Sequence, residues 1–470
     1  MYKVSFSRGF LAVMVAAIIS GCGSEGAFSG NSSSESDSVM PSPPTDSPAM
    51  PTNGVVKIFS SKHNPSFLAT RADGSVVTWG SPVYGGDSSS VDFSSGVKDV
   101  VFSWSNVAAV KNNGDVVSWG RDSMFDTRLD PEKFTGKVAR VDVSKNGSFV
   151  ATQENGSVVA WGDPGYPMFD LTLANGPAEQ IHINAYSAII ALRRPSGEFV
   201  TWGELNVGIP PRNVDLTQVD RFVSAGAGSS TTAFMKDMTI AAWGNGNHMN
   251  TSGVDLTGHF QAVYANGYAY FGIKVDGTVV AWGPEYFDNV NYGHDTTGVD
   301  FNGEIKAVIP SASAFAILKE DGSVVSWGAS SGLSGIATPE LSRDVVEVIA
   351  NSSREADAFA ALKADGSVVT WGDPTTGGDS SAVDFSGGVE KIISTSQAFA
   401  AIKKDGTVVA WGNPGKGGDV SHLDFSAGIK ELVANSSAFA ALMNDGSVIT
   451  WGDAERGGDS SGIDWFADNE

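Results

Sequence analysis

The sequence predicts an all-β protein, a β-propeller built from ten repeats of about forty residues. A constant period is typical of repeat architectures. The period here is that of a Trp-Gly pair, found at Trp79, Trp119, Trp161, Trp202, Trp243, Trp282, Trp327, Trp371, Trp411 and Trp451. Most of these pairs follow an Asp-Gly or Asn-Gly pair between apolar runs, a strong hairpin signal. Glycine-containing turns interrupt each run before a dozen residues, so helices are not expected.

Residues 388–424 show the elements of one repeat in order. G-V-E-K-I-I-S-T-S predicts a first strand, Q-A-F-A-A-I-K-K a second, D-G the hairpin turn and T-V-V-A-W-G a third. These runs are apolar on both faces, which favours blades stacked face to face. The short piece Val383-Asp384-Phe385 is expected to return across the preceding blade as an outer strand. Met238 stands where the turn glycine belongs, so the fifth hairpin is expected to be the least secure.

The terminal repeats are the most regular in the chain. An open solenoid ends in atypical capping repeats. Here Gly-Gly-Asp-Ser-Ser occurs after the first, eighth and tenth tryptophans, starting with Gly-Gly-Asp at 85–87, 377–379 and 457–459. These units would be near neighbours in a ring, so we expect a closed ring; the alternative is an open or subdivided array.

The N-terminus predicts an exported, lipid-anchored protein. Residues 1–21 contain a basic start and a short apolar run, as in a signal peptide. Ile19-Ser20-Gly21-Cys22 resembles a bacterial lipobox, and Cys22 is the only cysteine. Residues 22–53 are rich in serine and proline and predict a disordered tether; 54–470 form the ten-repeat domain. By resemblance to lipoproteins, Gly23 in place of the inner-membrane aspartate favours the outer membrane of a bacterial envelope.

The pattern A-L-K-x-D-G-x-V-x-x-W-G resembles the repeat of the regulator of chromosome condensation superfamily. The forty-residue version is closer to the β-lactamase inhibitor protein of the same superfamily. The resemblance covers residues 54–464 and implies a propeller, although both relatives have seven blades and this chain has ten repeats. The eukaryotic relative catalyses guanine-nucleotide exchange. We do not expect this activity here, because an exported lipoprotein does not meet a cytosolic GTPase.

The charge of the chain argues against nucleic-acid partners. Lys and Arg number 30 against 53 Asp and Glu, and the net charge is −23. A chain this acidic repels phosphate backbones, and no basic stripe offsets the effect.

Aromatic residues in irregular loops are the candidate binding surface. The loops after Trp119, Trp161 and Trp282 replace the glycine-rich version with aromatic residues. Such residues on one face suit recognition of a protein or glycan. The alternative is that the rings pack inward at the blade edges. The candidates are Phe125, Tyr166, Phe169, Tyr286, Phe287 and Tyr292.

No residue set in the sequence amounts to an active site or metal site. G-x-S-x-G occurs around Ser330 and Ser460, but a nucleophile elbow needs a following helix. The G-G-D-S-S loops read as turns held by Asp and Ser rather than as calcium loops. We therefore expect a non-catalytic binding propeller without cofactor. The alternatives are a propeller enzyme acting on polysaccharide and a structural or adhesive surface protein.

Overall fold

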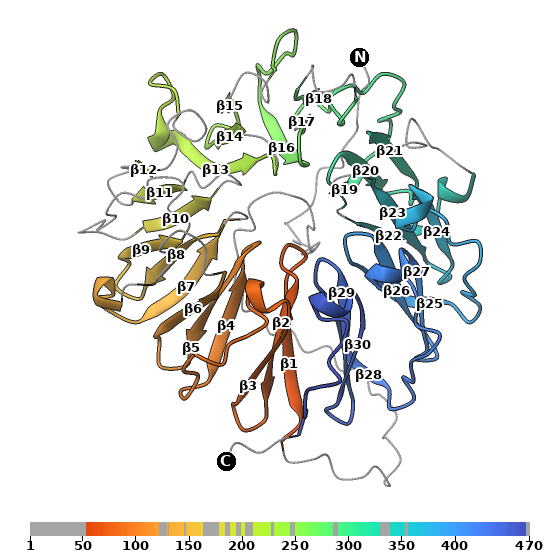
Figure 1. The fold of residues 1–470 in the computed structure, drawn as a ribbon. Coiled ribbons are helices and arrows are strands. Elements are labelled where there is room, and N and C mark those ends of the chain that lie inside the picture. Colours follow the sequence, from red (N-terminus) through yellow and green to blue (C-terminus); the bar gives the residue numbers. More distant parts are fainter. Residues whose placement is uncertain are drawn as a thin grey trace, which may run out of the picture.

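The structure is a computed structural model of the 470-residue chain. It describes residues 53–466 apart from 122–128, 130, 145–146, 163–177, 184–188, 194–198, 203–209, 227–229, 245–249, 285–289, 330–338, 352 and 354–355. These residues form ten three-stranded antiparallel sheets, which we call blades 1 to 10 in chain order. The blades are arranged around a common centre, as in a propeller (Figure 1). Within the same residues, no helix is long and apolar enough to cross a membrane.

Each blade contains three consecutive strands of four to six residues, as the repeat pattern of the sequence predicts. The first five blades are: blade 1, β1 Val55–Ser60, β2 Ser66–Arg71, β3 Val76–Gly80; blade 2, β4 Val97–Phe102, β5 Asn106–Lys111, β6 Val116–Gly120; blade 3, β7 Val138–Val143, β8 Ser148–Gln153, β9 Val158–Gly162; blade 4, β10 Ala178–Ile183, β11 Ile189–Arg193, β12 Phe199–Trp202; blade 5, β13 Val219–Ser224, β14 Ser230–Met235, β15 Ile240–Gly244.

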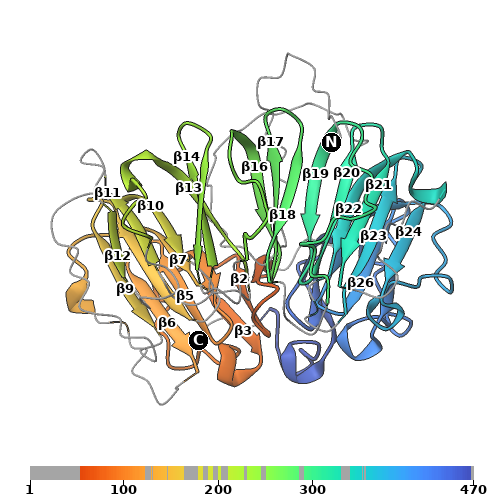
Figure 2. The same ribbon diagram turned by 90° about the horizontal axis from the view of Figure 1, so that it is seen from above.

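The other five blades repeat the same order, and Figure 2 shows the strands of blades 6, 7 and 8 side by side. They are: blade 6, β16 Phe260–Ala265, β17 Tyr270–Lys274, β18 Val279–Trp282; blade 7, β19 Ile305–Pro310, β20 Ala314–Lys319, β21 Val324–Gly328; blade 8, β22 Val345–Ala350, β23 Ala358–Lys363, β24 Val368–Gly372; blade 9, β25 Val389–Ser394, β26 Ala398–Lys403, β27 Val408–Gly412; blade 10, β28 Ile429–Ala434, β29 Ala438–Met443, β30 Val448–Gly452.

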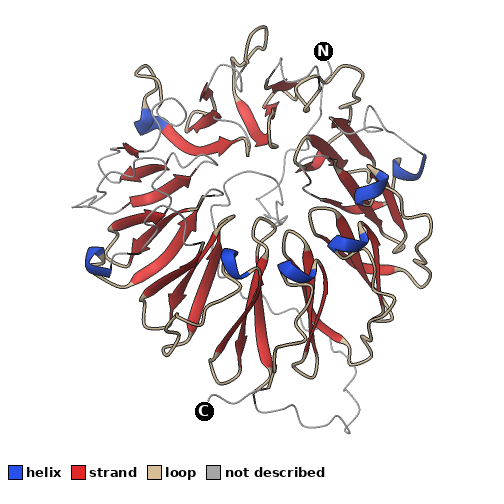
Figure 3. Ribbon diagram, in the orientation of Figure 1, coloured by secondary structure: helices blue, strands red, loops and turns tan. Residues whose placement is uncertain are grey.

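Short 3-10 helices lie in the connections, and Figure 3 shows how little of the fold they form. They are η1 Pro82–Tyr84, η2 Pro131–Lys133, η3 Leu216–Gln218, η4 Pro339–Leu341, η5 Pro374–Thr376, η6 Pro414–Lys416 and η7 Ala454–Arg456. The all-β prediction is thereby confirmed.

The hairpin between the second and third strands turns at the predicted Asp-Gly pair. Gly366 and Gly406 have φ of 89° and 84°, in the left-handed region that glycine enters without cost. Met238 occupies the same position in blade 5 with a φ of 68°, and β14 still pairs with β15. The fifth hairpin therefore forms, with a non-glycine residue in a conformation that disfavours side chains.

The core lies between the blades rather than within them. Phe399 of the middle strand stacks on Trp411 of the outer strand at 5.3 Å between ring centroids, and Ala398 and Ala400 are fully buried. In most blades the first strand contacts the first strand of the next, as β4 contacts β7 and β22 contacts β25. Small alanines let neighbouring sheets approach, while the stacked rings fill the wider outer gap.

One hydrogen bond recurs between consecutive blades. The indole Nε1 of Trp119, Trp327, Trp411 and Trp451 donates to the backbone oxygen of the glycine 34 residues earlier, at 2.9–3.1 Å. Blades 10 and 1 share the same contact, since Trp79 Nε1 donates to Gly457 O at 3.3 Å. The backbone bond from Val389 N to Gly366 O also has a counterpart there, from Val55 N to Gly446 O at 3.0 Å. The last blade therefore packs on the first as interior blades pack on one another.

The prediction of an outer strand at Val383-Asp384-Phe385 is wrong. These residues form no strand, and within the described ranges each sheet ends at its third strand. Phe385 instead packs edge-on against Trp411 of the following blade, at 5.3 Å and an interplanar angle of 85°. The side chain of Phe385 therefore packs on the next blade. The backbone consequently crosses between blades instead of running along one sheet edge.

Candidate functional site

The ring has two faces with different connections. We call the face with the turns between second and third strands the hairpin-turn face. The opposite face, with the turns between first and second strands and the segments after Trp-Gly, we call the loop face. The predicted binding residues belong to loop-face segments. Most of them lie outside the described residues, as does the lipidation candidate: Cys22, Phe125, Tyr166, Phe169, Tyr286 and Phe287.

Tyr292 is the one candidate that the structure describes. Its ring lies 4.3 Å from that of Tyr268, between centroids, with the two planes tilted by 32°. Both rings are half-buried. Asn266 holds the pair, because its Nδ2 donates to Tyr292 O at 2.7 Å and its Oδ1 accepts from Tyr268 N at 2.7 Å. Each ring therefore covers part of the other and leaves an aromatic edge on the loop face.

The Asn266 bond is one case of a clamp that recurs on this face. A side chain in the turn between first and second strands donates to the backbone oxygen just before a positive-φ glycine. Because the clamp binds backbone, it fixes the loop while the side chain at the clamped position varies. The five bonds run from Asn64 to Tyr84 O, Asn266 to Tyr292 O, Asn351 to Thr376 O, Thr395 to Lys416 O and Asn435 to Arg456 O, at 2.7–3.1 Å.

Trp104 is a loop-face residue that the sequence reasoning missed. It lies in the turn between β4 and β5 and is 52% exposed, whereas the Trp-Gly tryptophans are buried or half-buried wherever the structure describes their side chains. Buried Asn64 fixes its surroundings, because Nδ2 donates to Ser103 O at 2.8 Å as well as to Tyr84 O. Val83, 53% exposed, precedes the clamped Tyr84. The signal in the sequence was a tryptophan outside the repeating Trp-Gly pair.

Charged groups at the clamped positions of blades 9 and 10 are paired. Lys416 Nζ lies 2.7 Å from Asp453 Oδ2, and Arg456 Nε lies 3.5 Å from the same oxygen. One carboxylate thus lies between two basic groups from neighbouring blades. This sector of the loop face is therefore charged.

The most perturbed titratable groups are buried between blades. Burial lowers the pKa of His182 to about 3, and His182 Nε2 lies 2.7 Å from Ser224 Oγ of the next blade. Burial raises the pKa of Asp142, with Arg140 Nε 3.1 Å away. Burial also raises the pKa of Asp357, which accepts hydrogen bonds from Ser313 N and Ala312 N. The His182 and Asp357 bonds join neighbouring blades, the Asp142 pair lies within blade 3, and all three side chains are buried.

The two motifs considered as possible catalytic or metal sites, G-x-S-x-G and G-G-D-S-S, form turns wherever the structure describes them. Ser460 accepts a hydrogen bond from Thr450 Oγ1 at 2.9 Å in a segment without a following helix, and Ser330 lies outside the described residues. Asp379 Oδ1 accepts from Ser381 N at 2.9 Å, a bond that lowers its pKa. Among the residues that the structure describes, no three His, Cys, Asp or Glu side chains gather as metal ligands would.

Comparison with known proteins gives similarity of fold only. No family model and no curated protein matches the chain. Similar solved structures include the ectodomain of the receptor kinase CR4 from Physcomitrella patens, with 14% identity and a TM-score of 0.36 over 59% of this chain and 74% of that one. The CRINKLY WD40 ectodomain of ACR4 from Arabidopsis thaliana has 17% identity and a TM-score of 0.33, over 59% and 97%. Prp20p from Saccharomyces cerevisiae, the yeast RCC1, has 15% identity and a TM-score of 0.31, over 63% and 80%.

These values carry no argument about activity or partners. The chain has a β-propeller fold. That assignment rests on the ten three-stranded sheets and their packing. The repeat motif in the sequence predicts the same fold.

Proposed function

We propose that this chain is a lipid-anchored protein of the bacterial cell envelope that binds a protein or glycan partner through its loop face. Cys22 carries the lipid, and residues 22–53 tether the propeller to the membrane. The outer membrane is favoured because Gly23, and not the aspartate of inner-membrane lipoproteins, follows Cys22. In this proposal the propeller is a non-catalytic recognition module, and the clamped loops present its variable side chains.

The observation that carries the proposal is that Trp104 and Val83 are both exposed, and that each follows or precedes a residue whose backbone oxygen Asn64 binds. A rigidly held tryptophan loses little conformational entropy on binding and buries a large apolar area. Tryptophan is accordingly enriched among the residues whose truncation costs about 2 kcal/mol or more at interfaces. The Tyr268–Tyr292 pair and the predicted aromatic loops would extend the same surface.

Site-specific photo-crosslinking in intact cells tests the loop face. A photoreactive phenylalanine is placed at position 104, at position 287 in the predicted loop, and at position 275 as control. Val275 is 53% exposed, like Trp104, but lies in the hairpin between β17 and β18 on the opposite face. We expect the same discrete adduct from positions 104 and 287 and none from 275. An equal adduct from 275, or none from either loop-face position, contradicts the proposal.

Two further measurements address the anchor and the absence of catalysis. A palmitate analogue should label the wild-type chain and not Cys22→Ser, and persistent label in that variant refutes the anchor. Incubation with envelope polysaccharides should release no reducing ends, and release that depends on the protein would favour the enzyme alternative.

A further inference from the structure

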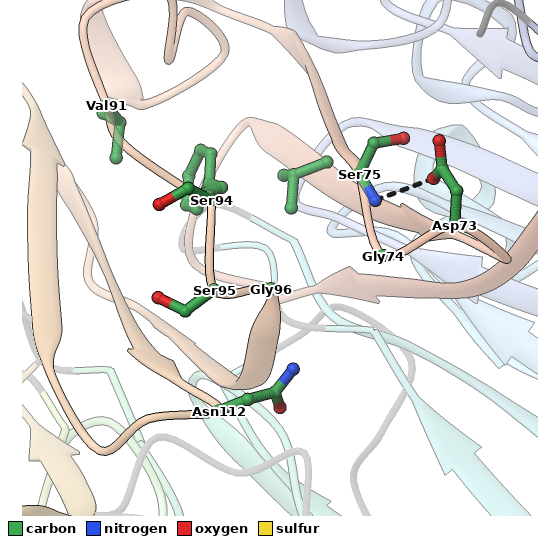
Figure 4. A pocket seen from close by; sticks show the side chains of 10 residues that line it. Asp73, Gly74, Ser75, Val91, Ser94, Ser95, Gly96 and Asn112 are labelled. Atoms are coloured by element: carbon green, nitrogen blue, oxygen red, sulfur yellow. Dashed lines mark hydrogen bonds between the residues drawn. The ribbon is translucent and has the colours of Figure 1, made fainter. Parts of the chain in front are cut away.

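A hollow of about 540 Å³ opens on the hairpin-turn face between blades 1 and 2. One wall is the β2–β3 turn, with Asp73 and Ser75, and the other is the linker segment with Ser94 and Ser95. Figure 4 shows the two walls facing each other, with Asn112 of the β5–β6 turn at one end. The volume falls within the range of roughly 300–1,000 Å³ that small-molecule sites occupy.

The corresponding gap between blades 8 and 9 is closed by a lysine. There Lys404, the counterpart of Asn112, crosses the gap and donates from Nζ to Asp365 O at 3.3 Å. A Cβ built on Gly366 would lie 2.9 Å from Gly388 Cα, 3.0 Å from Val389 N and 3.1 Å from that Nζ, whereas one built on Gly74 meets nothing within 4 Å. Along the lining, the two gaps differ in two side chains, since Gly387 also replaces Ser95. The gap between blades 8 and 9 is therefore closed by backbone, with Val389 N donating to Gly366 O at 2.8 Å, and by the lysine. The hollow lies where the backbone is farther from the turn glycine and where a short asparagine stands in place of the lysine.

The lining chemistry selects the class of ligand. Among the described residues, no basic side chain lines the hollow, and Asp73 faces it as a carboxylate whose pKa the Ser75 hydrogen bonds hold below the ordinary value. An anion is therefore disfavoured. The side-chain amide of Asn112 and the hydroxyl of Ser95 bond to no other group in the described chain, and both can donate and accept.

The remaining lining is apolar and comes from half-buried side chains. Val76, Val91 and Phe93 contribute it, and Phe93 is held edge-on against Trp119 at 5.4 Å between centroids. A mostly polar lining with an apolar patch of Val76, Val91 and Phe93 suits a molecule that has both hydroxyl edges and C–H faces. A sugar ring has that composition.

We propose that this hollow is a binding site for a neutral saccharide, distinct from the loop face. The ring hydroxyls exchange hydrogen bonds with Asn112, Ser95 and the free lone pairs of the Asp73 carboxylate. The apolar face of the ring lies against Val76 and Phe93. Because the hollow is open to solvent, the glycan chain continues outward from the bound unit.

The test uses the full-length lipoprotein in detergent and saturation-transfer NMR. The probes are maltose, cellobiose and N,N′-diacetylchitobiose, each at about 1 mM, a concentration suited to weak sites. We expect transfer to at least one disaccharide and at least a fivefold loss in Asn112→Lys, which copies the closing lysine of blades 8 and 9. The absence of transfer to all three probes, or undiminished transfer in Asn112→Lys, overturns the proposal.

A further variant separates ligand binding from a general effect on the fold. Asn444→Lys makes the same change between blades 9 and 10, where Ala427 replaces Ser95, and should keep at least half of the transfer. An equal loss in Asn112→Lys and Asn444→Lys overturns the proposal.

Discussion

Removing the Trp465 side chain should destabilise the propeller as severely as removing an interior blade contact. Trp465 follows the last blade and packs edge-on against Trp79 of the first, at 5.2 Å between centroids. It is 9% exposed, and Arg71 Nε donates to its backbone oxygen at 3.2 Å. Trp465 thus packs on the Trp-Gly tryptophan of blade 1 as Phe301 packs edge-on against Trp327 of blade 7, where the ring centroids are 5.3 Å apart.

The magnitude follows from the buried area. A buried tryptophan removes roughly 150–250 Å² from water, which at about 25 cal/mol per Å² gives about 4–6 kcal/mol as an upper bound. Measured truncations of buried Trp or Phe to Ala cost about 3–5 kcal/mol. We expect a loss of that size in the free energy of unfolding for Trp465→Ala, and a similar loss for the matched control Phe301→Ala, which is 3% exposed.

Urea unfolding followed by far-UV circular dichroism measures both losses without relying on tryptophan emission. The first transition gives the free energy, since a long repeat array can unfold in several steps. A change below about 1 kcal/mol in Trp465→Ala, beside a full loss in Phe301→Ala, would refute the packing of the last blade on the first.

Three further outcomes follow from individual contacts. Met238→Gly relieves a positive φ of 68° at a half-exposed turn and should raise the free energy of unfolding by about 0.5–1 kcal/mol, measured by urea titration; a loss would contradict the strain argument. Asn64→Ala leaves buried carbonyl groups of the loop face without their donor and should cost about 2–4 kcal/mol, whereas a neutral effect would show that the clamp is not needed. The Ser94 and Lys111 hydrogen bonds lower the pKa of Asp92 from 3.8 to about 2, so its contribution to stability is present above pH 4 and is lost as the pH falls toward 2. Urea midpoints at pH 5, 3 and 2 should therefore fall less steeply in Asp92→Asn than in the wild type, and parallel curves would contradict this.

The strands and hairpins could be predicted from the sequence because their causes are local. Asp365-Gly366 needs only its own φ and flanking apolar runs to turn, and the Trp-Gly pair marks the outer strand of each blade. The path of Val383-Asp384-Phe385 could not be predicted in the same way. It depends on the ring of Trp411, which lies in another blade, and apolar alternation alone does not distinguish a strand from an anchored linker.

The candidate surfaces depend on comparisons between repeats. Trp104 is visible in the sequence as a tryptophan outside the Trp-Gly period, but its exposure follows from the bonds of Asn64 to two loops. The hollow is harder to foresee, because it depends on how closely the backbones of two blades approach and on whether the side chain at 112 or 404 spans the gap between them. Such a distance is set by the packing of two sheets and leaves no local signal.

Single-particle electron microscopy of the detergent-solubilised protein tests most directly whether the ten repeats form one ring. The account predicts end-on class averages with ten blades and no opening between the first and the last. A ring with fewer blades, or an arc with separated ends, would contradict it.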